Sequence, residues 1–202
     1  MVALIGWLVV TSASAQRDPA QHDDHAHHSQ AAAGTSYSRV VEAYEPPPVT
    51  LVDRSGEAVL FSEAVRHDGP LLLQFIFTTC PAVCPVLSGT FAAARDGLPP
   101  EVRMVSISID PEQDTPARLR DYADRFRAGT DWRFLTGSRH DVVRVQKAFA
   151  AYRSNKMQHQ PLTFLRPAAA AHWVRLDGFL SAADLVVEVE KASKVSLEPG
   201  RG

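Results

Sequence analysis

The chain contains two cysteines, Cys80 and Cys84, four positions apart in the stretch "FTTCPAVCPVLSG", and a proline follows each of them. Thiolates ligate soft metal ions and also attack or form disulfides, so the pair predicts either a soft-metal site or a redox couple. A purely structural disulfide is the weaker interpretation, because closing a loop of about five residues stabilises a fold by only about 2 kcal/mol in the chain-entropy model.

The segments around the cysteines predict how they are positioned. A nearly continuous apolar run, Pro70 to Thr79, is typical of a central strand buried on both faces. The residues after Cys80 continue in helical fashion, so we expect both cysteines on one face of a helix N-terminus, with positions i and i+4 roughly 6 Å apart. The helix dipole and the free backbone N–H groups there favour thiolates, which predicts a lowered pKa for both thiols.

Strands alternate with helices along the rest of the domain. Strands are expected at Val49–Asp53 and Val102–Asp110, and a hairpin-like pair of strands at Thr163–Arg166 and His172–Gly178. One helix is expected to have Thr115 as its N-cap, Pro116 as its first residue and Gly129 as its stop. Two more helices are expected at Arg139–Tyr152 and Ala182–Ala192. This order indicates βαβ units and places the protein in the α/β class.

Composition limits the kinds of partner. The 202 residues are 45% hydrophobic and 22% charged, which is typical of a globular domain with a sizeable core. The formal net charge of -2 shows no excess of basic residues, so we expect no nucleic-acid partner.

The N-terminus predicts export. An apolar run from Val2 to Val10 precedes an A-x-A site at Ala13–Ala15, so residues 1–15 are predicted to be a signal peptide cleaved before Gln16. Nine apolar residues fall short of the roughly 20 that span a bilayer, so an uncleaved anchor is the weaker alternative. We expect a periplasmic protein that is peripheral to the membrane at most.

A polar segment follows the predicted signal peptide. Residues 16–39 are predicted to form a disordered tether, residues 40–194 the folded domain and residues 195–202 a disordered tail. The tether contains His22, His25, His27 and His28, which either serve as a solvated spacer or capture a copper, nickel or zinc ion.

The motif "FTTCPAVCP", followed about twenty residues later by "SISIDPEQDTPARLRDYA" and then by His159 before a strand, resembles the Sco/SenC copper-chaperone family. The resemblance covers roughly Val49 to Lys191. It implies a thioredoxin-like fold with a central mixed sheet flanked by helices. It also implies a copper site formed by Cys80, Cys84 and His159, used in assembly of the binuclear copper centre of cytochrome c oxidase. The implied partner is a copper-accepting subunit of that oxidase or another copper chaperone.

The chemistry of these three side chains agrees with copper. Two thiolates and one imidazole form a soft set with few ligands, which favours Cu(I), with Cu(II) as the alternative state. Zinc prefers four ligands in structural sites, and the spacing offers no fourth ligand.

Several positions depart from the family pattern and keep a second function open. Gln158 stands where the family commonly has an acidic residue, and "RPAAAA" from Arg166 replaces its usual turn. Pro161 stands where thioredoxin-like oxidoreductases place a cis-proline. The alternative is therefore a thiol-disulfide oxidoreductase, with Cys80 and Cys84 as the redox pair, that keeps the copper-ligand cysteines of a partner reduced. The C-x-x-x-C spacing counts against it, since the usual redox motif is C-x-x-C.

Whether the protein is an enzyme at all is left open, and a metallochaperone is favoured. A peroxidase is less favoured still, because Phe77 stands where peroxiredoxins place a threonine.

Overall fold

The computed structural model describes residues 36–168 and 170–195. The predicted signal peptide, nearly all of the predicted tether with its four histidines, and the tail from residue 196 lie outside the described residues. The strands are β1 (Tyr37–Glu42), β2 (Thr50–Asp53), β3 (Ala58–Leu60), β4 (Leu71–Ile76), β5 (Arg103–Ser108), β6 (Trp132–Gly137), β7 (Leu162–Arg166) and β8 (Trp173–Gly178). The helices are α1 (Phe61–Ala64), α2 (Val83–Ala94), α3 (Pro116–Arg125), α4 (Arg139–Ala148) and α5 (Ala182–Val195), with short 3₁₀ turns η1 (Arg95–Gly97) and η2 (Lys156–Gln158).

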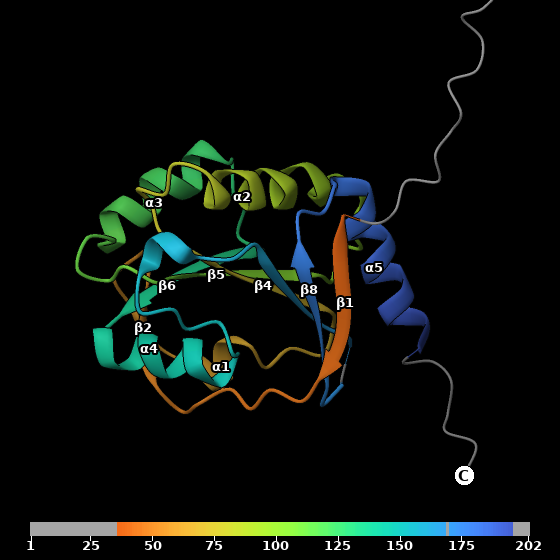
Figure 1. Ribbon diagram of the computed structural model, residues 1–202, viewed down its shortest axis with the longest axis horizontal. Helices are drawn as coiled ribbons and strands as arrows, with labels where there is room; N and C mark the ends of the chain where they lie inside the picture. Colours follow the sequence, from red (N-terminus) through yellow and green to blue (C-terminus); the bar gives the residue numbers. More distant parts are fainter. Residues whose placement is uncertain (1–35, 169, 196–202) are drawn as a thin grey trace, which may run out of the picture. The chain divides into compact units, whose positions relative to one another are not determined.

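All eight strands belong to one mixed sheet in the order β1-β8-β7-β4-β5-β6-β2-β3 (Figure 1). β4 pairs in parallel with β5, and β5 in parallel with β6, whereas the other neighbours are antiparallel. β4 lies inside the sheet and every one of its residues is buried, as its apolar run predicts. The predicted α/β class with a mixed sheet flanked by helices is confirmed.

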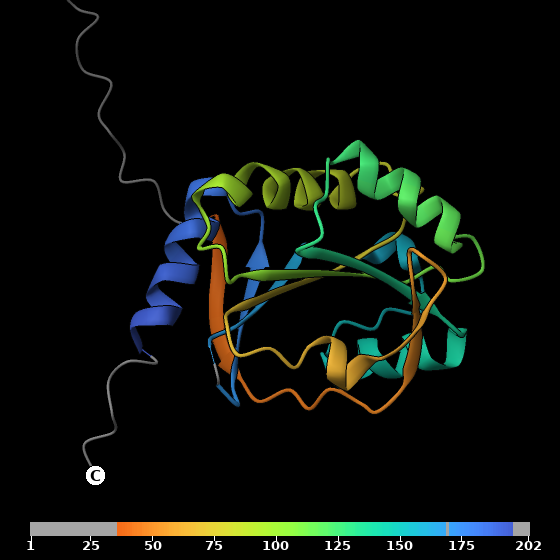
Figure 2. The ribbon, with the colours of Figure 1, turned by 180° about the vertical axis from the view of Figure 1, so that it is seen from behind.

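The sheet separates two hydrophobic cores, and alternate residues of β4 contribute to each of them. Leu72 and Ile76 join the core that also contains residues of α2, α3 and α5, whereas Leu71, Leu73 and Phe75 join the core shared with α1 and α4. Figures 1 and 2 show α2 and α3 over one face of the sheet, α1 and α4 over the other, and α5 beside β1. This alternation follows from the two-residue period of a strand.

The predicted first residues of the helices agree with the structure better than the predicted last residues do. The Thr115 side chain accepts a hydrogen bond from the backbone of Arg118, and Pro116 is the first residue of α3, as predicted. α4 ends at Ala148 rather than at the predicted Tyr152. The chain leaves the helix because Ala150 adopts a φ of 52° and the N–H of Ala151 turns back to the carbonyl of Gln146.

Strand β1 begins at Tyr37, before the expected domain boundary at Val40. β1 pairs with β8 from Tyr37 opposite Gly178 to Glu42 opposite Trp173. Glu188 of α5 accepts hydrogen bonds from the Tyr37 hydroxyl and from Nε of Arg39, which fixes the start of this strand. These partners lie about 150 residues away in the sequence, so a local pattern does not reveal them.

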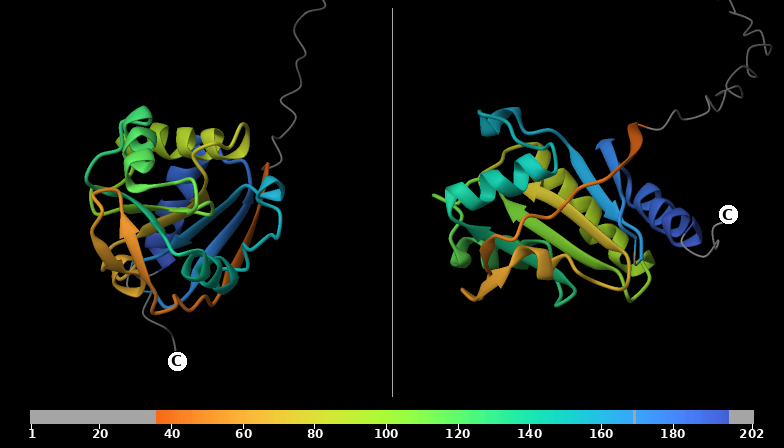
Figure 3. Two further views of the ribbon diagram at one scale, coloured as in Figure 1. Left: turned by 90° about the vertical axis from the view of Figure 1, so that its left-hand side faces the viewer. Right: turned by 90° about the horizontal axis from the view of Figure 1, so that it is seen from below.

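The C-terminal ends of β4 and β5 and the N-terminal end of β7 lie on the same side of the sheet. β4 and β5 run in the same direction and β7 runs against them, as their arrows show in Figure 3. The segment after β4 carries the cysteines, the segment after β5 carries Asp110 and Asp114, and the segment before β7 carries His159. The topology therefore brings the candidate ligands to the same edge. Among the helices of the described residues, none has the length and apolar character needed to cross a bilayer.

Candidate metal centre

Cys80 lies in the turn after β4, ahead of the helix. The N–H of Cys80 donates to the carbonyl of Phe77 over 3.1 Å, which closes a turn through Thr78 and Thr79. α2 begins at Val83 with Ala82 as its N-cap, so Cys84 alone of the two cysteines is helical. The predicted placement of both cysteines on one helix was wrong, because Pro81 disfavours the α conformation for the residue before it.

Cys80 and Cys84 nevertheless contact one another directly. The backbone N–H of Cys84 donates to Sγ of Cys80 over 3.3 Å, and the N–H of Phe77 donates to Sγ of Cys84 over 3.4 Å. Both cysteines are free thiols; Cys84 is buried and Cys80 is partly exposed. The two cysteines are therefore close together, as the spacing predicts, but Cys80 lies in a turn and not in the helix.

Burial raises the pKa of the Cys84 thiol well above its ordinary value, and a hydrogen bond with the Cys80 thiol acts in the same direction. The N–H of Phe77 opposes this shift but does not overcome it. The prediction that the helix N-terminus lowers the pKa of both thiols is therefore wrong for Cys84, because desolvation outweighs the dipole. A bound cation would supply the missing compensation, since metal ligation displaces the thiol proton.

A buried carboxylate supports the turn that leads to Cys80. Asp114 follows β5, and one of its oxygens accepts from the hydroxyl of Thr78 over 2.6 Å. The other oxygen accepts from the hydroxyl of Ser108, also over 2.6 Å, and the N–H of Thr78 lies within 3.1 and 3.3 Å of the two oxygens. Residue-type and spacing arguments did not identify Asp114. Asp114 lies in the stretch "SISIDPEQDTPARLRDYA" that carries the resemblance to the Sco/SenC family, and this motif is the sequence signal that could have found it.

The beginning of α2 is also tied to the core. Tyr122 of α3 is buried, and its hydroxyl donates to the carbonyl of Cys84 over 3.2 Å and lies 2.9 Å from the hydroxyl of Ser88. Burial raises the pKa of the Tyr122 hydroxyl above its ordinary value, so it remains a hydrogen-bond donor at neutral pH. Gln74 of β4 donates to Ser88 over 3.2 Å and extends the network beneath the cysteine helix.

His159 directly follows η2. Its ring packs edge-on to Phe77, with ring centroids 6.4 Å apart, and its Nε2 is buried without a hydrogen-bond partner among the described residues. Burial lowers the pKa of His159 to about 4, against an opposing interaction with the backbone of Phe75. The imidazole is therefore neutral at pH 7, which is the form that ligates metals.

The structure brings the two cysteines together but does not bring His159 into a cluster with them. Within residues 36–168 and 170–195, no three side chains of His, Cys, Asp or Glu gather closely enough to hold a metal ion. His159 touches the site through Phe77, which lies three residues before Cys80 in the same turn. The peptide bond before Pro161 is trans, as are all the others described.

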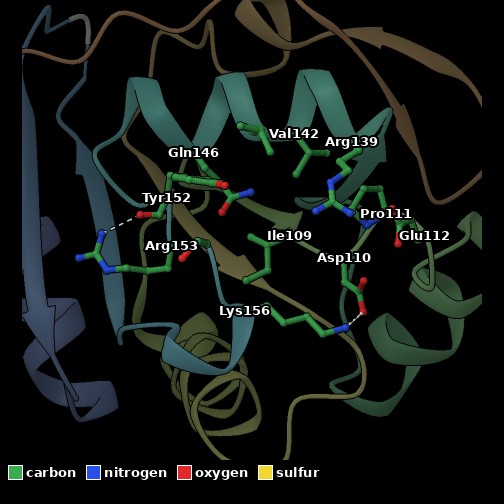
Figure 4. A pocket seen from close by; sticks show the side chains of 12 residues that line it. Ile109, Asp110, Pro111, Glu112, Arg139, Val142, Gln146, Tyr152, Arg153 and Lys156 are labelled. Carbon is green, nitrogen blue, oxygen red and sulfur yellow. Dashed lines mark hydrogen bonds and ion pairs between the residues drawn. The ribbon is translucent and has the colours of Figure 1, made fainter.

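A polar cavity of about 220 Å³ lies between α4, the segment after β5 and the segment that leads into η2 (Figure 4). In its wall Lys156 forms an ion pair with Asp110, and Arg139 forms one with Glu112 over 2.8 Å. The Lys156 ammonium also lies 5.5 Å from the centre of the Phe77 ring. The two contacts of Lys156 hold η2, and with it the position of His159, against the segments after β5 and β4.

Comparison with known proteins places this fold and site in a family. The model of the SCO1/SenC family matches residues 41–191. The SCO1 protein homolog of Bacillus subtilis (strain 168) is 35% identical over 98 residues, which are 46% of this chain and 50% of that protein. The chain spans about half the length of the first curated relatives that it matches.

Solved structures match over nearly their whole length. Arabidopsis thaliana ScoI with copper bound superposes with a TM-score of 0.64 and 26% identity, covering 74% of this chain and 98% of that chain. BsSco, described as a member of the Sco family of cytochrome c oxidase assembly proteins, superposes with a TM-score of 0.63 and 26% identity, covering 77% of this chain and 96% of its own. The thioredoxin-like fold implied by the sequence motif is thereby confirmed. Since the family model matches most of the chain, this protein belongs to the SCO1/SenC family.

Proposed function

We propose that this protein binds copper through Cys80, Cys84 and His159 and carries it for the assembly of cytochrome c oxidase. The observation that carries the proposal is the contact between two free cysteines beside the ends of β4 and β5, in which the N–H of Cys84 donates to Sγ of Cys80. The copper in the Arabidopsis relative, and the oxidase-assembly family named for BsSco, support copper as the cargo and the oxidase as its destination.

The exposure of the two cysteines suggests how copper enters and leaves. Two sulfurs form a soft, low-coordination site that suits Cu(I). Because Cys84 is buried and Cys80 is partly exposed, an accepting protein reaches the metal from the Cys80 side. The acceptor in this proposal is a copper-accepting oxidase subunit or another copper chaperone.

His159 joins the site only after a rearrangement. Its buried Nε2 has no partner among the described residues, and a buried nitrogen left unpaired is costly, so a metal ion would satisfy it. Since the described residues form no three-ligand cluster, the segment from Lys156 to Pro161 has to approach the cysteine turn when copper is bound by all three ligands.

The proposal places the mature protein in the periplasm. It depends on the predicted signal peptide over residues 1–15, and intact-mass analysis of protein from the periplasmic fraction tests it. A mature chain that starts at Gln16 is expected, and retention of Met1–Ala15 would contradict the prediction.

Titration of the fully reduced chain with Cu(I), in competition with a chromophoric chelator, tests copper binding. We expect one tightly bound equivalent, with an X-ray absorption spectrum that contains two sulfur and one nitrogen neighbours. A variant with alanine at His22, His25, His27 and His28 is the control. Loss of the tight equivalent in that variant would assign copper to the histidine cluster and reject the proposal.

A second candidate function is reduction of the copper-ligand cysteines of a partner. It is favoured by the contact between the two free cysteines and by the disulfide switch for which the BsSco structure is described. Reduction of insulin disulfides by the protein with a dithiol donor measures this activity. Catalysed turnover without stoichiometric Cu(I) capture would favour the oxidoreductase over the copper carrier.

A further inference from the structure

We infer that Asp114 is a positioning residue for the copper site, which acts through Thr78 to set where the Cys80 thiol lies relative to Cys84. The inference rests on the proposed function and deepens it. Asp114 forms hydrogen bonds with Thr78 and not with either sulfur, so its effect is transmitted through the turn between β4 and α2.

The contacts of Asp114 are directed at the cysteine turn. Its side chain is fully buried, and within the described part of the chain no Lys, Arg or His forms an ion pair with it. Its hydrogen-bond donors are the N–H and hydroxyl of Thr78 and the hydroxyl of Ser108. A buried carboxylate is costly unless it is well hydrogen-bonded, so this arrangement holds the three donors in a defined geometry.

The position of Asp114 in the chain supports an acidic side chain. The residue directly precedes Thr115, the N-cap of α3, where the helix dipole favours negative charge. Its own N–H donates to the carbonyl of Asp110 over 2.8 Å, which fixes the backbone of the segment after β5. Asp114 thus lies in the short segment between β5 and α3, and backbone contacts at both Asp110 and the start of α3 hold its position.

The turn transmits this position to the sulfur. Thr78 is the second residue of the turn that the bond from Cys80 N–H to Phe77 carbonyl closes, and Cys80 is its fourth. Cys84 is located by the N–H of Phe77, the first residue of this turn, and by the hydroxyl of Tyr122 from α3. The distance between the two sulfurs thus depends on the conformation of this turn, and the hydrogen bonds from Thr78 to Asp114 hold that conformation.

Asp114→Asn replaces one acceptor oxygen with an NH2 donor, so the hydroxyl of either Thr78 or Ser108 loses its acceptor and the turn relaxes. Loss of an outer-shell partner of a metal ligand typically costs about 10- to 100-fold in metal affinity, and we expect Asp114→Asn to fall in this range. Thr78→Val removes the hydroxyl but keeps the N–H, so a smaller loss in the same direction is expected.

A second measurement does not involve copper. In glutathione buffers, Cys80 and Cys84 lose two protons and two electrons and form one S–S bond, while the S–S bond of glutathione disulfide breaks to give two glutathione thiols. The equilibrium constant depends on how well the two thiols are aligned. We expect Asp114→Asn to change it about 10-fold or more, by the same loss of alignment.

The experiment compares Cu(I) affinity and the glutathione equilibrium for the full chain and the variants Asp114→Asn, Thr78→Val and Asp53→Asn. Asp53 is the matched control, because it also accepts hydrogen bonds from a hydroxyl and from backbone N–H groups, but in the turn after β2. Asp53→Asn is expected to leave both readouts within about twofold of the unmodified chain, since its contacts stabilise a turn outside the site.

Weaker Cu(I) binding and a shifted equilibrium in Asp114→Asn, with Asp53→Asn unchanged, support the inference. Unchanged values in Asp114→Asn, or equal changes in Asp53→Asn, would overturn it. If the unmodified chain binds no Cu(I), the proposed function fails, and the glutathione equilibrium then decides the role of Asp114 by itself.

Discussion

The hydroxyl of Tyr122 donates a hydrogen bond to the carbonyl oxygen of Cys84 over 3.2 Å, from one helix to the next. The hydroxyl oxygen of Tyr122 also lies 2.9 Å from the hydroxyl of Ser88, which is one turn further along α2 than Cys84. Because Tyr122 is buried, water does not replace these contacts. The bond connects the cysteine inside α2 to the core between α2 and α3, so the packing of that core helps to position the candidate ligand.

We expect Tyr122→Phe to lower the free energy of unfolding by about 1 to 2 kcal/mol, because it leaves a buried hydroxyl of Ser88 without this partner and removes a bond to Cys84. Urea unfolding of the reduced protein measures the effect. Tyr152→Phe is the control, since Tyr152 is exposed, and it should change stability by less than about 0.5 kcal/mol. Equal stabilities for Tyr122→Phe and the unmodified chain would show that the bond contributes nothing.

Cys80→Ser and Cys84→Ser should each abolish tight Cu(I) binding, because each removes one soft thiolate. The loss should exceed the roughly 100-fold effect of removing an outer-shell partner. Competition with a chromophoric chelator gives the affinity, and circular dichroism checks the fold. Retention of tight binding by either variant would exclude that cysteine as a ligand.

His159→Ala should weaken Cu(I) binding and leave the fold intact, because a two-sulfur site still holds Cu(I). The expected X-ray absorption spectrum loses its nitrogen neighbour and keeps both sulfurs. His140→Ala, at an exposed position on α4, serves as the control and should bind copper like the unmodified chain. An unchanged affinity in His159→Ala would remove His159 from the proposed ligand set.

Copper loading should depend on the redox state of the cysteines. A Cys80–Cys84 disulfide consumes both thiols, so the oxidised protein should not take Cu(I) at this site. At a free copper concentration of 100 times Kd, binding adds about 2.7 kcal/mol to the stability of the reduced form. Thermal melts of reduced and oxidised protein with one equivalent of Cu(I) measure the difference. Equal shifts in both forms would place copper elsewhere, such as on the cluster from His22 to His28.

Glu188 should make the stability of the domain sensitive to acid. Burial acts to raise its pKa, but hydrogen bonds from Lys191, Arg39 and Tyr37 outweigh burial and hold the pKa below its ordinary value. Such a group stabilises the fold fully above the ordinary pKa of about 4.3, and this contribution is lost as the pH falls through the lower folded-state pKa.

Glu188→Gln should therefore lower the free energy of unfolding by about 1 to 2 kcal/mol at pH 7, a range reduced for the partial exposure of Arg39 and Lys191. The difference from the unmodified chain should stay constant down to about pH 5 and shrink below about pH 4. Glu190→Gln, an exposed neighbour on α5, is the control. A difference that does not change with pH would mean that the charge of Glu188 contributes nothing.

The sequence by itself determined the features that depend on local patterns. The apolar run before Cys80 predicted the buried strand β4, and Thr115 with Pro116 predicted the start of α3. Hydrophobic period and helix caps act over a few residues, so they can be read along the chain. The motif around the cysteines also indicated the family, which the match over residues 41–191 confirms.

Tertiary structure alone decided the environment of the candidate ligands. The high pKa of the Cys84 thiol results from burial by neighbouring helices and strands, which outweighs the helix dipole that the local sequence suggested. Asp114 meets Thr78 across 36 positions of sequence because β4 and β5 are parallel neighbours, and Glu188 meets Tyr37 across 151. Desolvation and hydrogen bonds between distant segments depend on which elements pack together, and local residue patterns do not encode that choice.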